Sequence, residues 1–317
     1  MTEHGPPKRP SQRSRSDPSA PREGRVGGGG VGSRAPDVER GPDSLTRGFS
    51  IPPPPPEPTF AEYHADRWKH FIEHLGEVAE LTVRTTRSIF RRPFEIASTI
   101  QQMESLGVRS MGIVTVTSVF IGMVMTIQFA FGLKRFGGLE YIPRVVVLSF
   151  CRELAPTLTA IIVGGRIGSG MAAEVGAMNV TEQVDAIRAL GADPAKKLVL
   201  PRMLAAIVVM PILSVYALML GILGGILVCW FQFDVTPTFF VTSSLEVTRI
   251  SDFFVGVLKT PVFGYIIAIV GCHFGLRTSG GTEGVGSSTT RTVVAVSITI
   301  LIADFVLTKL FMFFQAS

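Results

Sequence analysis

The chain has 317 residues, of which 46% are hydrophobic and only 17% charged, and its mean hydropathy is +0.38. It is too apolar for an ordinary soluble domain, and its 33 glycines interrupt it too often for a coiled coil. The formal net charge of +5 is typical of basic loops that face anionic headgroups, so we expect no nucleic-acid partner. The three cysteines form no CxxC pair, which argues against a metal site and against a disulfide framework.

Residues 1–58 are rich in proline, glycine and arginine, and we predict that they form a disordered tail. They contain nine Lys/Arg and seven Asp/Glu, and five consecutive prolines at Pro52–Pro56. Such a segment cannot bury enough apolar surface to offset the entropy of ordering its chain. The acidic residues argue against an organelle transit peptide, and a tether is favoured over a proline-rich ligand. Without a secretory signal at the start, insertion is expected to depend on internal spans.

Residues 59–109 are predicted to form an amphipathic interfacial helix followed by a connector. Between Phe60 and Phe90, apolar residues recur near helical spacing and most charged residues fall elsewhere on the helical wheel. Several arginines in this segment suit anionic lipid headgroups. The alternative is a helix that packs on another protein surface.

Residues 110–317 are predicted to be a membrane domain, so the fold class is an all-α integral membrane protein with about five transmembrane helices. Ser110–Leu133 contains 24 residues without a charge, enough to cross a bilayer core of roughly 30 Å at about 1.5 Å per residue. The other spans are expected near Val145–Met171, Met203–Phe233, Phe253–Gly275 and Thr292–Phe314.

Basic residues in the flanks of the spans predict the orientation. The region before the first span is basic, and the 174–202 loop has four Lys/Arg, whereas the loop after the third span has one. This places the N-terminus and the loops 174–202 and 276–291 inside. Lys134, Arg135 and Arg144 oppose this assignment.

Motifs for catalysis are absent from the sequence. It contains no GxxxxGK[ST] phosphate loop, no HExxH pair and no Ser/His/Asp arrangement. We therefore predict no catalytic residue, no cofactor and no ATP hydrolysis in this chain.

Ionisable residues interrupt three of the expected spans. A charge at bilayer depth costs roughly 2.5–3.5 kcal/mol, so it is expected to face a partner or a wet cavity. Glu153, Lys259 and Asp304 are predicted to form a neutralising cluster. Arg152 and Glu153 could instead extend to the headgroups, and for Arg166, which lies on one seven-residue stripe with Arg152, both alternatives stay open.

Small residues follow on the same helix at four-residue spacing. Gly164, Gly165 and Gly168 are predicted to let neighbouring helix backbones approach closely in lipid, which is a packing role.

A short amphipathic helix is predicted between the second and third spans. Asn179 with Glu182 fits an N-cap and its capping carboxylate, and Gly191 fits a C-terminal stop. Val184 and Leu190 belong to its expected apolar face, and Asp193-Pro194 is expected to open the next helix. A helix at this position suits docking of a nucleotide-binding partner, while a solvated loop helix is the alternative.

Three separated blocks of this sequence resemble one family. RELAPTLTAIIVGGRIGSGMAAEVGAMNVTEQVDAIRALGADPAKKLVLPR (Arg152–Arg202), IGMVMTIQ (Ile121–Gln128) and RTVVAVSITILIADFVLTKLF (Arg291–Phe311) are similar to segments of the MlaE/YrbE-type permeases of MCE-associated lipid ABC transporters. The resemblance extends from about Phe60 to the end of the chain and leaves out the proline-rich tail.

The resemblance implies a function and a set of partners. Such permeases lie in the bacterial inner membrane as homodimers, bind a cytoplasmic ABC ATPase that uses ATP and Mg²⁺, and meet a periplasmic MCE-domain protein. They move phospholipids or related lipids between the inner and outer membranes and so affect outer-membrane asymmetry. The positions that match the lipid cavity are Arg152, Glu153, Lys259 and Asp304. The candidates for ATPase coupling are Glu174, Asn179, Thr181, Glu182, Gln183, Asp185 and Arg188.

Two other functions remain open from the residues alone. Glu153, Lys259 and Asp304 would also suit an ion-coupled secondary transporter or a channel. A structural membrane anchor is the third alternative.

Overall fold

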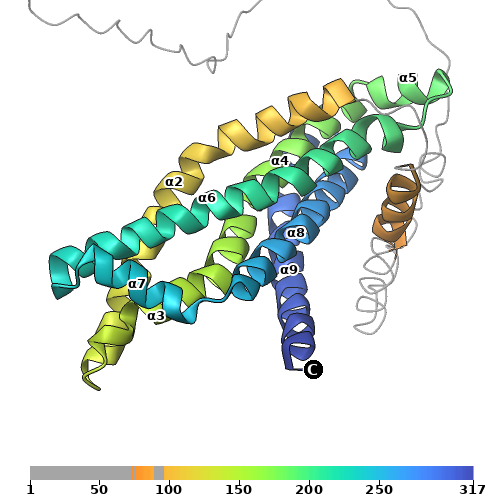
Figure 1. Cartoon of the computed structure of the whole chain (residues 1–317). Coiled ribbons are helices and arrows are strands. Elements are labelled where there is room, and N and C mark those ends of the chain that lie inside the picture. The colour runs from red at the N-terminus through yellow and green to blue at the C-terminus, as the bar shows by residue number, and fades with distance from the viewer. Residues whose placement is uncertain (1–72, 74–75, 89–95, 317) are drawn as a thin grey trace, which may run out of the picture. The chain divides into compact units, whose positions relative to one another are not determined.

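The computed structural model describes residues 73, 76–88 and 96–316, and their regular structure is entirely helical (Figure 1). This confirms the predicted all-α class for the described part of the chain. The predicted tail, residues 1–58, lies outside the described residues. The helical segments after residue 95 are α2 (Ile96–Lys134), η1 (Leu139–Tyr141), α3 (Ile142–Ser149), η2 (Phe150–Leu158), α4 (Thr159–Val180), α5 (Gln183–Ala189), η3 (Ala195–Val199), α6 (Leu200–Phe233), α7 (Pro237–Val247), α8 (Ile250–Leu276) and α9 (Gly281–Ala316).

Five stretches of helix are long and apolar enough to cross a membrane, as predicted. They are Ile96–Lys134, Leu139–Val180, Ala195–Phe233, Ile250–Leu276 and Gly281–Phe314. Each is longer than the span expected from the sequence, because the helices continue into polar and charged residues beyond it. The charge-free run Ser110–Leu133, for example, is the second part of α2. The α5 segment and α7 lie toward opposite ends of these long helices (Figure 1).

The second stretch is not a regular α-helix. Its segment η2 (Phe150–Leu158) is π-helical and contains Pro156. Proline lacks a backbone N–H and clashes with the preceding turn, so it breaks the ordinary hydrogen-bond ladder. A π-helical turn contains more residues than an α-helical turn, so side chains in η2 are spaced differently around the helix axis than in a regular α-helix. In and after this segment Arg152 is half-buried, Thr159 is buried and Arg166 is exposed.

Close helix packing occurs at the glycines of α4. A methyl group on Gly164 would lie 2.9 Å from Cδ1 of Ile267 on α8, and one on Gly168 would lie 3.2 Å from Cγ2 of Val296 on α9. At Gly165 the corresponding distance to Cγ1 of Val293 is 3.5 Å. The absence of side chains thus lets α8 and α9 approach α4, with the main hydrophobic core between them.

The helical segment 76–88 packs against the membrane domain. Val78 and Leu81 are partly buried against the main core, and Glu77 forms a 2.6 Å ion pair with Arg277 at the end of α8. Part of its apolar face therefore contacts this chain. Its predicted position on a membrane surface stays a prediction.

Candidate functional site

The ammonium group of Lys259 on α8 is the centre of a buried cluster of polar side chains. It is fully buried and donates hydrogen bonds to Glu153 Oε1 at 2.9 Å and to Asp304 Oδ1 at 3.2 Å. It also donates to Thr308 Oγ1 at 2.8 Å, and this hydroxyl lies 3.1 Å from Glu153 Oε1. The structure thus brings together three predicted residues from η2, α8 and α9. Thr308 is a further member, and its spacing of four from Asp304 on one helix is the signal that could have identified it.

Lys259 also reaches a backbone acceptor, the carbonyl of Arg152, which lies one turn before Pro156. In an α-helix the N–H of residue 156 would bond the carbonyl of Arg152, but proline has no N–H. Lys259 Nζ lies 3.2 Å from this carbonyl oxygen and donates to it. The same ammonium group therefore bonds two carboxylates and also a backbone carbonyl to which Pro156 cannot donate.

A second ion pair lies beside the cluster. Arg152 Nε donates to Asp252 Oδ1 at 2.9 Å, and only 3% of the Asp252 side chain is exposed. Asp252 also accepts the backbone N–H of Arg249 at 2.9 Å, in the first turn of α8. The sequence prediction missed Asp252 because it precedes the expected start of the fourth span by one residue. Its place three residues after Arg249, in a helix's first turn, was the available signal.

The cluster adjoins a cavity of about 450 Å³ between α2, η2, α8 and α9. Arg152, Glu153 and Thr308 lie in its wall, and 42% of the Glu153 side chain is exposed. Most of the remaining wall is apolar. The cavity thus combines charged groups in one part with a hydrophobic surface, an arrangement that suits an amphiphilic molecule. Its other lining residues are Met125, Phe129, Leu148, Ser149, Leu154, Val255, Phe311 and Met312.

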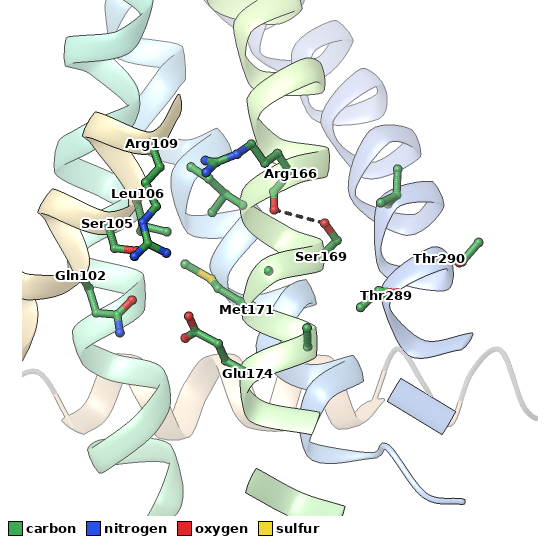
Figure 2. A pocket seen from close by; sticks show the side chains of 14 residues that line it. Gln102, Ser105, Leu106, Arg109, Arg166, Ser169, Met171, Glu174, Thr289 and Thr290 are labelled. Carbon is green, nitrogen blue, oxygen red and sulfur yellow. Dashed lines mark hydrogen bonds between the residues drawn. The ribbon is translucent and has the colours of Figure 1, made fainter. Parts of the chain in front are cut away.

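Arg166 does not belong to this cluster. Its Nη1 donates to Ser110 Oγ on α2 at 2.7 Å, and it lines a different cavity with Arg109 and Glu174. Figure 2 shows this second cavity.

The predicted N-cap at Asn179 is wrong. Helix α4 continues to Val180, and Asn179 Nδ2 donates to the carbonyl of Thr278 at 3.0 Å. This tertiary hydrogen bond holds Asn179 within the last turn of α4. The N-cap residue of α5 is Glu182, which has a left-handed backbone (φ 59°) and forms no side-chain capping bond. The chain therefore turns at Glu182, after Thr181 Oγ1 has bonded back to the carbonyl of Ala177 at 2.8 Å.

Helix α5 ends as expected but buries less than expected. Gly191 has a φ of 76°, a conformation that glycine adopts without strain, which confirms the C-terminal stop. Of the expected apolar face, Val184 is fully buried, whereas Leu190 is 86% exposed. The reason is that the helix ends one residue earlier, at Ala189, and the turn directs Leu190 outward. The polar candidates Glu182, Gln183, Asp185 and Arg188 are all exposed.

Glu174 links the two helices that flank α5. Its Oε2 accepts a hydrogen bond from Arg202 Nη2 at 3.1 Å, and Arg202, at the start of α6, is buried. Arg202 also donates to the carbonyl of Leu198 at 2.8 Å. Arg202 was absent from the predicted site because it was taken as the basic flank of the third span. The pair ties α4 to α6 at the point from which α5 projects.

Five apolar spans and a buried charged cluster beside an amphiphilic cavity define a multi-pass membrane protein of the permease type. Residues 99–310 match the model of the family described as "Permease MlaE", and the chain belongs to this family. This confirms the resemblance seen in the sequence.

Similar proteins that have names are also described as permeases or carry the name of a lipid. The chain is 39% identical over 241 residues to a "Probable ABC transporter permease protein" of Rickettsia felis, covering 76% of this chain and 93% of the relative. It is 44% identical over 213 residues to a protein of the same description from Synechocystis, covering 67% and 81%. It is also 40% identical over 214 residues to the chloroplastic protein trigalactosyldiacylglycerol 1 of Arabidopsis thaliana, covering 68% and 61%.

Proposed function

We propose that this permease moves phospholipids or related lipids between the inner and outer membranes of a bacterium, driven by a separate ABC ATPase. The observation that carries the proposal is the cavity of about 450 Å³ whose wall is largely apolar and also contains Arg152 and Glu153. A lipid needs both kinds of surface, one for its acyl chains and one for its headgroup. Membership of the MlaE family and the lipid in the name of the Arabidopsis relative support the same substrate class.

The charged groups of the cavity suit a phospholipid headgroup. Arg152 is half-exposed while it pairs with Asp252, so its guanidinium can also bind a phosphate. Glu153 is similarly half-exposed while Lys259 holds one of its oxygens. Both side chains are thus fixed in place by buried partners before a lipid arrives, which lowers the entropic cost of binding it.

The α5 segment is the proposed coupling site for the ATPase. Its exposed polar residues Glu182, Asp185 and Arg188 would contact the partner, in which ATP and Mg²⁺ bind. Movement of α5 would reach α4 directly through the Thr181–Glu182 turn and reach α6 through the Glu174–Arg202 pair. The two helices would then shift relative to α8 and change the shape of the cavity.

A second copy of the chain and an MCE-domain protein complete the proposed assembly. Helix α9 is the most exposed of the five apolar stretches, with 11% of its most apolar window buried. Its exposed side chains are large and apolar, including Ile298, Leu301 and Phe305. Such a surface suits lipid or the same helix of a second copy. The MCE-domain protein would bind on the side opposite α5, in the periplasm.

Transport of a fluorescent phospholipid by the purified complex in proteoliposomes tests the proposal. We expect an ATPase chain to co-purify, flux to require ATP and Mg²⁺, and Glu153→Gln to reduce flux at least tenfold. Flux that ignores ATP and follows a pH gradient would instead establish the ion-coupled alternative. Normal flux in variants of Glu153, Lys259 and Asp304 would reduce the cluster to a structural role, as in a membrane anchor.

A further inference from the structure

Three cavities follow one another between α2 and the helical stretch that runs from the end of α3 through η2 into α4. The cavity of about 450 Å³ lies beside Met125 and Phe129 of α2, and a narrow crevice of about 10 Å³ lies beside Val114–Ile121. A third cavity, of about 570 Å³, lies beside Gln102–Arg109. This stretch lines them in the opposite order, from Ser149 of α3 through Thr159 to Glu174 of α4. The space between α2 and this stretch is thus wide at both ends and narrow in the middle.

Two arginines of the third cavity have no acidic partner among the residues that the structure describes. Arg109 of α2 and Arg166 of α4 extend toward the same space (Figure 2). Within this part of the chain, neither guanidinium has a carboxylate within ion-pair distance, and Arg166 donates a hydrogen bond to the neutral hydroxyl of Ser110. Glu174 is the acidic residue among those lining the cavity, and it already pairs with Arg202. The two guanidinium groups can therefore bind an anion in this cavity.

This cavity lies where the apolar core of the membrane domain begins. Arg109 directly precedes the charge-free run Ser110–Leu133, and Arg202, the partner of Glu174, directly precedes Met203–Phe233. On α9 the lining residue Thr290 is followed by Arg291 and then by the charge-free run Thr292–Ala303. Charge-free runs fill the hydrocarbon, so the residues before them lie at headgroup depth. The cavity is thus at headgroup depth on the side of α5, opposite the Lys259 cluster.

We propose that this cavity binds the phosphate of a phospholipid in the leaflet on the α5 side, as a second lipid site of the same permease. Arg109 and Arg166 bind the phosphate oxygens, because a guanidinium matches them with two N–H donors. Leu106, Met171 and Val293 provide apolar surface for the adjoining part of the lipid. The volume of about 570 Å³ is within the range of small-molecule sites, about 300–1,000 Å³. The inference rests on the proposed lipid substrate, and it adds a site in the other leaflet to it.

Native mass spectrometry of the full-length chain in detergent with dioleoyl-phosphatidylglycerol tests this inference. We expect wild-type chains to retain one more phospholipid than Arg109→Gln/Arg166→Gln chains, and the Kd of that site to rise at least tenfold in the variant. Arg109→Lys/Arg166→Lys keeps the charge and is expected to lose less than the glutamine pair. The matched control is Lys197→Gln/Arg291→Gln, which removes the same charge from other cavities on the same side. An equal loss in this control would overturn the site.

A second measurement uses the wild-type chain and so does not depend on how the variants fold. A phosphatidylethanolamine with a photoreactive diazirine on its headgroup is expected to label the peptides that contain Arg109 or Arg166. Labelling confined to the residues around Glu153 and Lys259 would overturn the second site. Inorganic phosphate that displaces the lipid at equal concentration would assign the cavity to a soluble anion instead.

These binding assays contain neither ATP nor a partner chain. A failure of ATP-driven transport therefore leaves their result unchanged. Conversely, normal transport with no lipid bound at Arg109 and Arg166 would overturn this inference alone.

Discussion

The Nζ of Lys259 lies 2.9 Å from Glu153 Oε1, and this contact joins α8 to the π-helical segment next to it. The same ammonium holds Asp304 of α9 at 3.2 Å. Three helical segments thus meet at one buried positive charge. Lys259 is fully buried, whereas Glu153 is partly exposed to the cavity, so the lysine supports the site and the glutamate can contact a substrate.

Replacing Lys259 by methionine is expected to destabilise the protein by about 3 kcal/mol, because Glu153 and Asp304 would lose their shared positive partner. The measurement is thermal unfolding of the purified chain in detergent. The triple variant Lys259→Met/Glu153→Gln/Asp304→Asn removes all three charges and is expected to regain most of the stability but not the lipid flux. Wild-type stability and flux in the single variant would show that the ion pairs contribute to neither property.

The Arg152–Asp252 pair is expected to show a stronger coupling than an exposed pair elsewhere in the same protein. Arg152→Gln leaves the buried Asp252 carboxylate with the N–H of Arg249, at an expected cost of about 2 kcal/mol. Asp252→Asn in the same chain should recover part of this loss, and a double-mutant cycle measures the coupling energy.

The matched control for this cycle is the Arg144–Glu246 pair. Its ion-pair distance is 2.8 Å, but 65% of the Glu246 side chain is exposed. Solvent screening limits such a pair to about 1 kcal/mol or less. Equal coupling energies in the two cycles would contradict the role assigned to burial.

The spans and the core of the cluster could be predicted because both follow from the membrane as a solvent. Long charge-free runs predict helices that cross it, and the cost of an isolated charge predicts that Glu153, Lys259 and Asp304 meet. Asp252 could not be placed by the same reasoning. Its burial depends on how η2 and the start of α8 pack, which a hydropathy pattern does not specify.

The error at Asn179 has a similar origin. Capping rules consider a few neighbouring residues, and Asn179 with Glu182 satisfies them. The structure instead gives Asn179 a partner 99 residues away, the carbonyl of Thr278, and α4 continues past it. Local rules also did not predict the π-helical segment η2, because Pro156 indicates a break in the α-helix but not that Lys259 will bond the carbonyl of Arg152.

Gly256 on α8 is predicted to tolerate no side chain. A methyl group there would overlap the backbone carbonyl oxygen of Cys151 in η2, so α8 would have to move away from the charged cluster. We expect Gly256→Ala to lower stability by about 1–3 kcal/mol and to reduce flux, as measured by thermal unfolding and transport.

The control for Gly256 is Gly112→Ala on α2, where a methyl group would meet no atom within 4 Å. Because alanine favours a helix over glycine by about 1 kcal/mol, this variant is expected to be as stable as the wild type or more stable. A similar loss in both variants would mean that the close contact with η2 is not the cause.

The exposed carboxylates at the start of α5 are expected to couple the permease to its ATPase. Glu182→Lys/Asp185→Lys reverses both charges on a surface that contributes little to folding, since the Asp185–Arg188 pair is exposed on both sides. We therefore expect an inserted, normally stable permease whose ATP-dependent lipid flux falls at least tenfold. ATP hydrolysis by the co-purified complex, measured in parallel, should no longer depend on the lipid substrate.

Glu140→Lys/Glu246→Lys is the matched control for this variant. It makes the same change in net charge at exposed residues near the opposite ends of the helices, next to α3 and on α7. Flux and hydrolysis should stay coupled in this control, because these residues lie away from α5. Glu182→Asn gives a further comparison: asparagine accepts the left-handed backbone at this position (φ 59°) more readily than glutamate, so it removes one charge while keeping the turn. Coupled flux at the wild-type rate in Glu182→Lys/Asp185→Lys would exclude these carboxylates from the ATPase contact. If Glu182→Asn also lowers the flux, although less, the loss of flux results from the change in charge and not from a change in the turn.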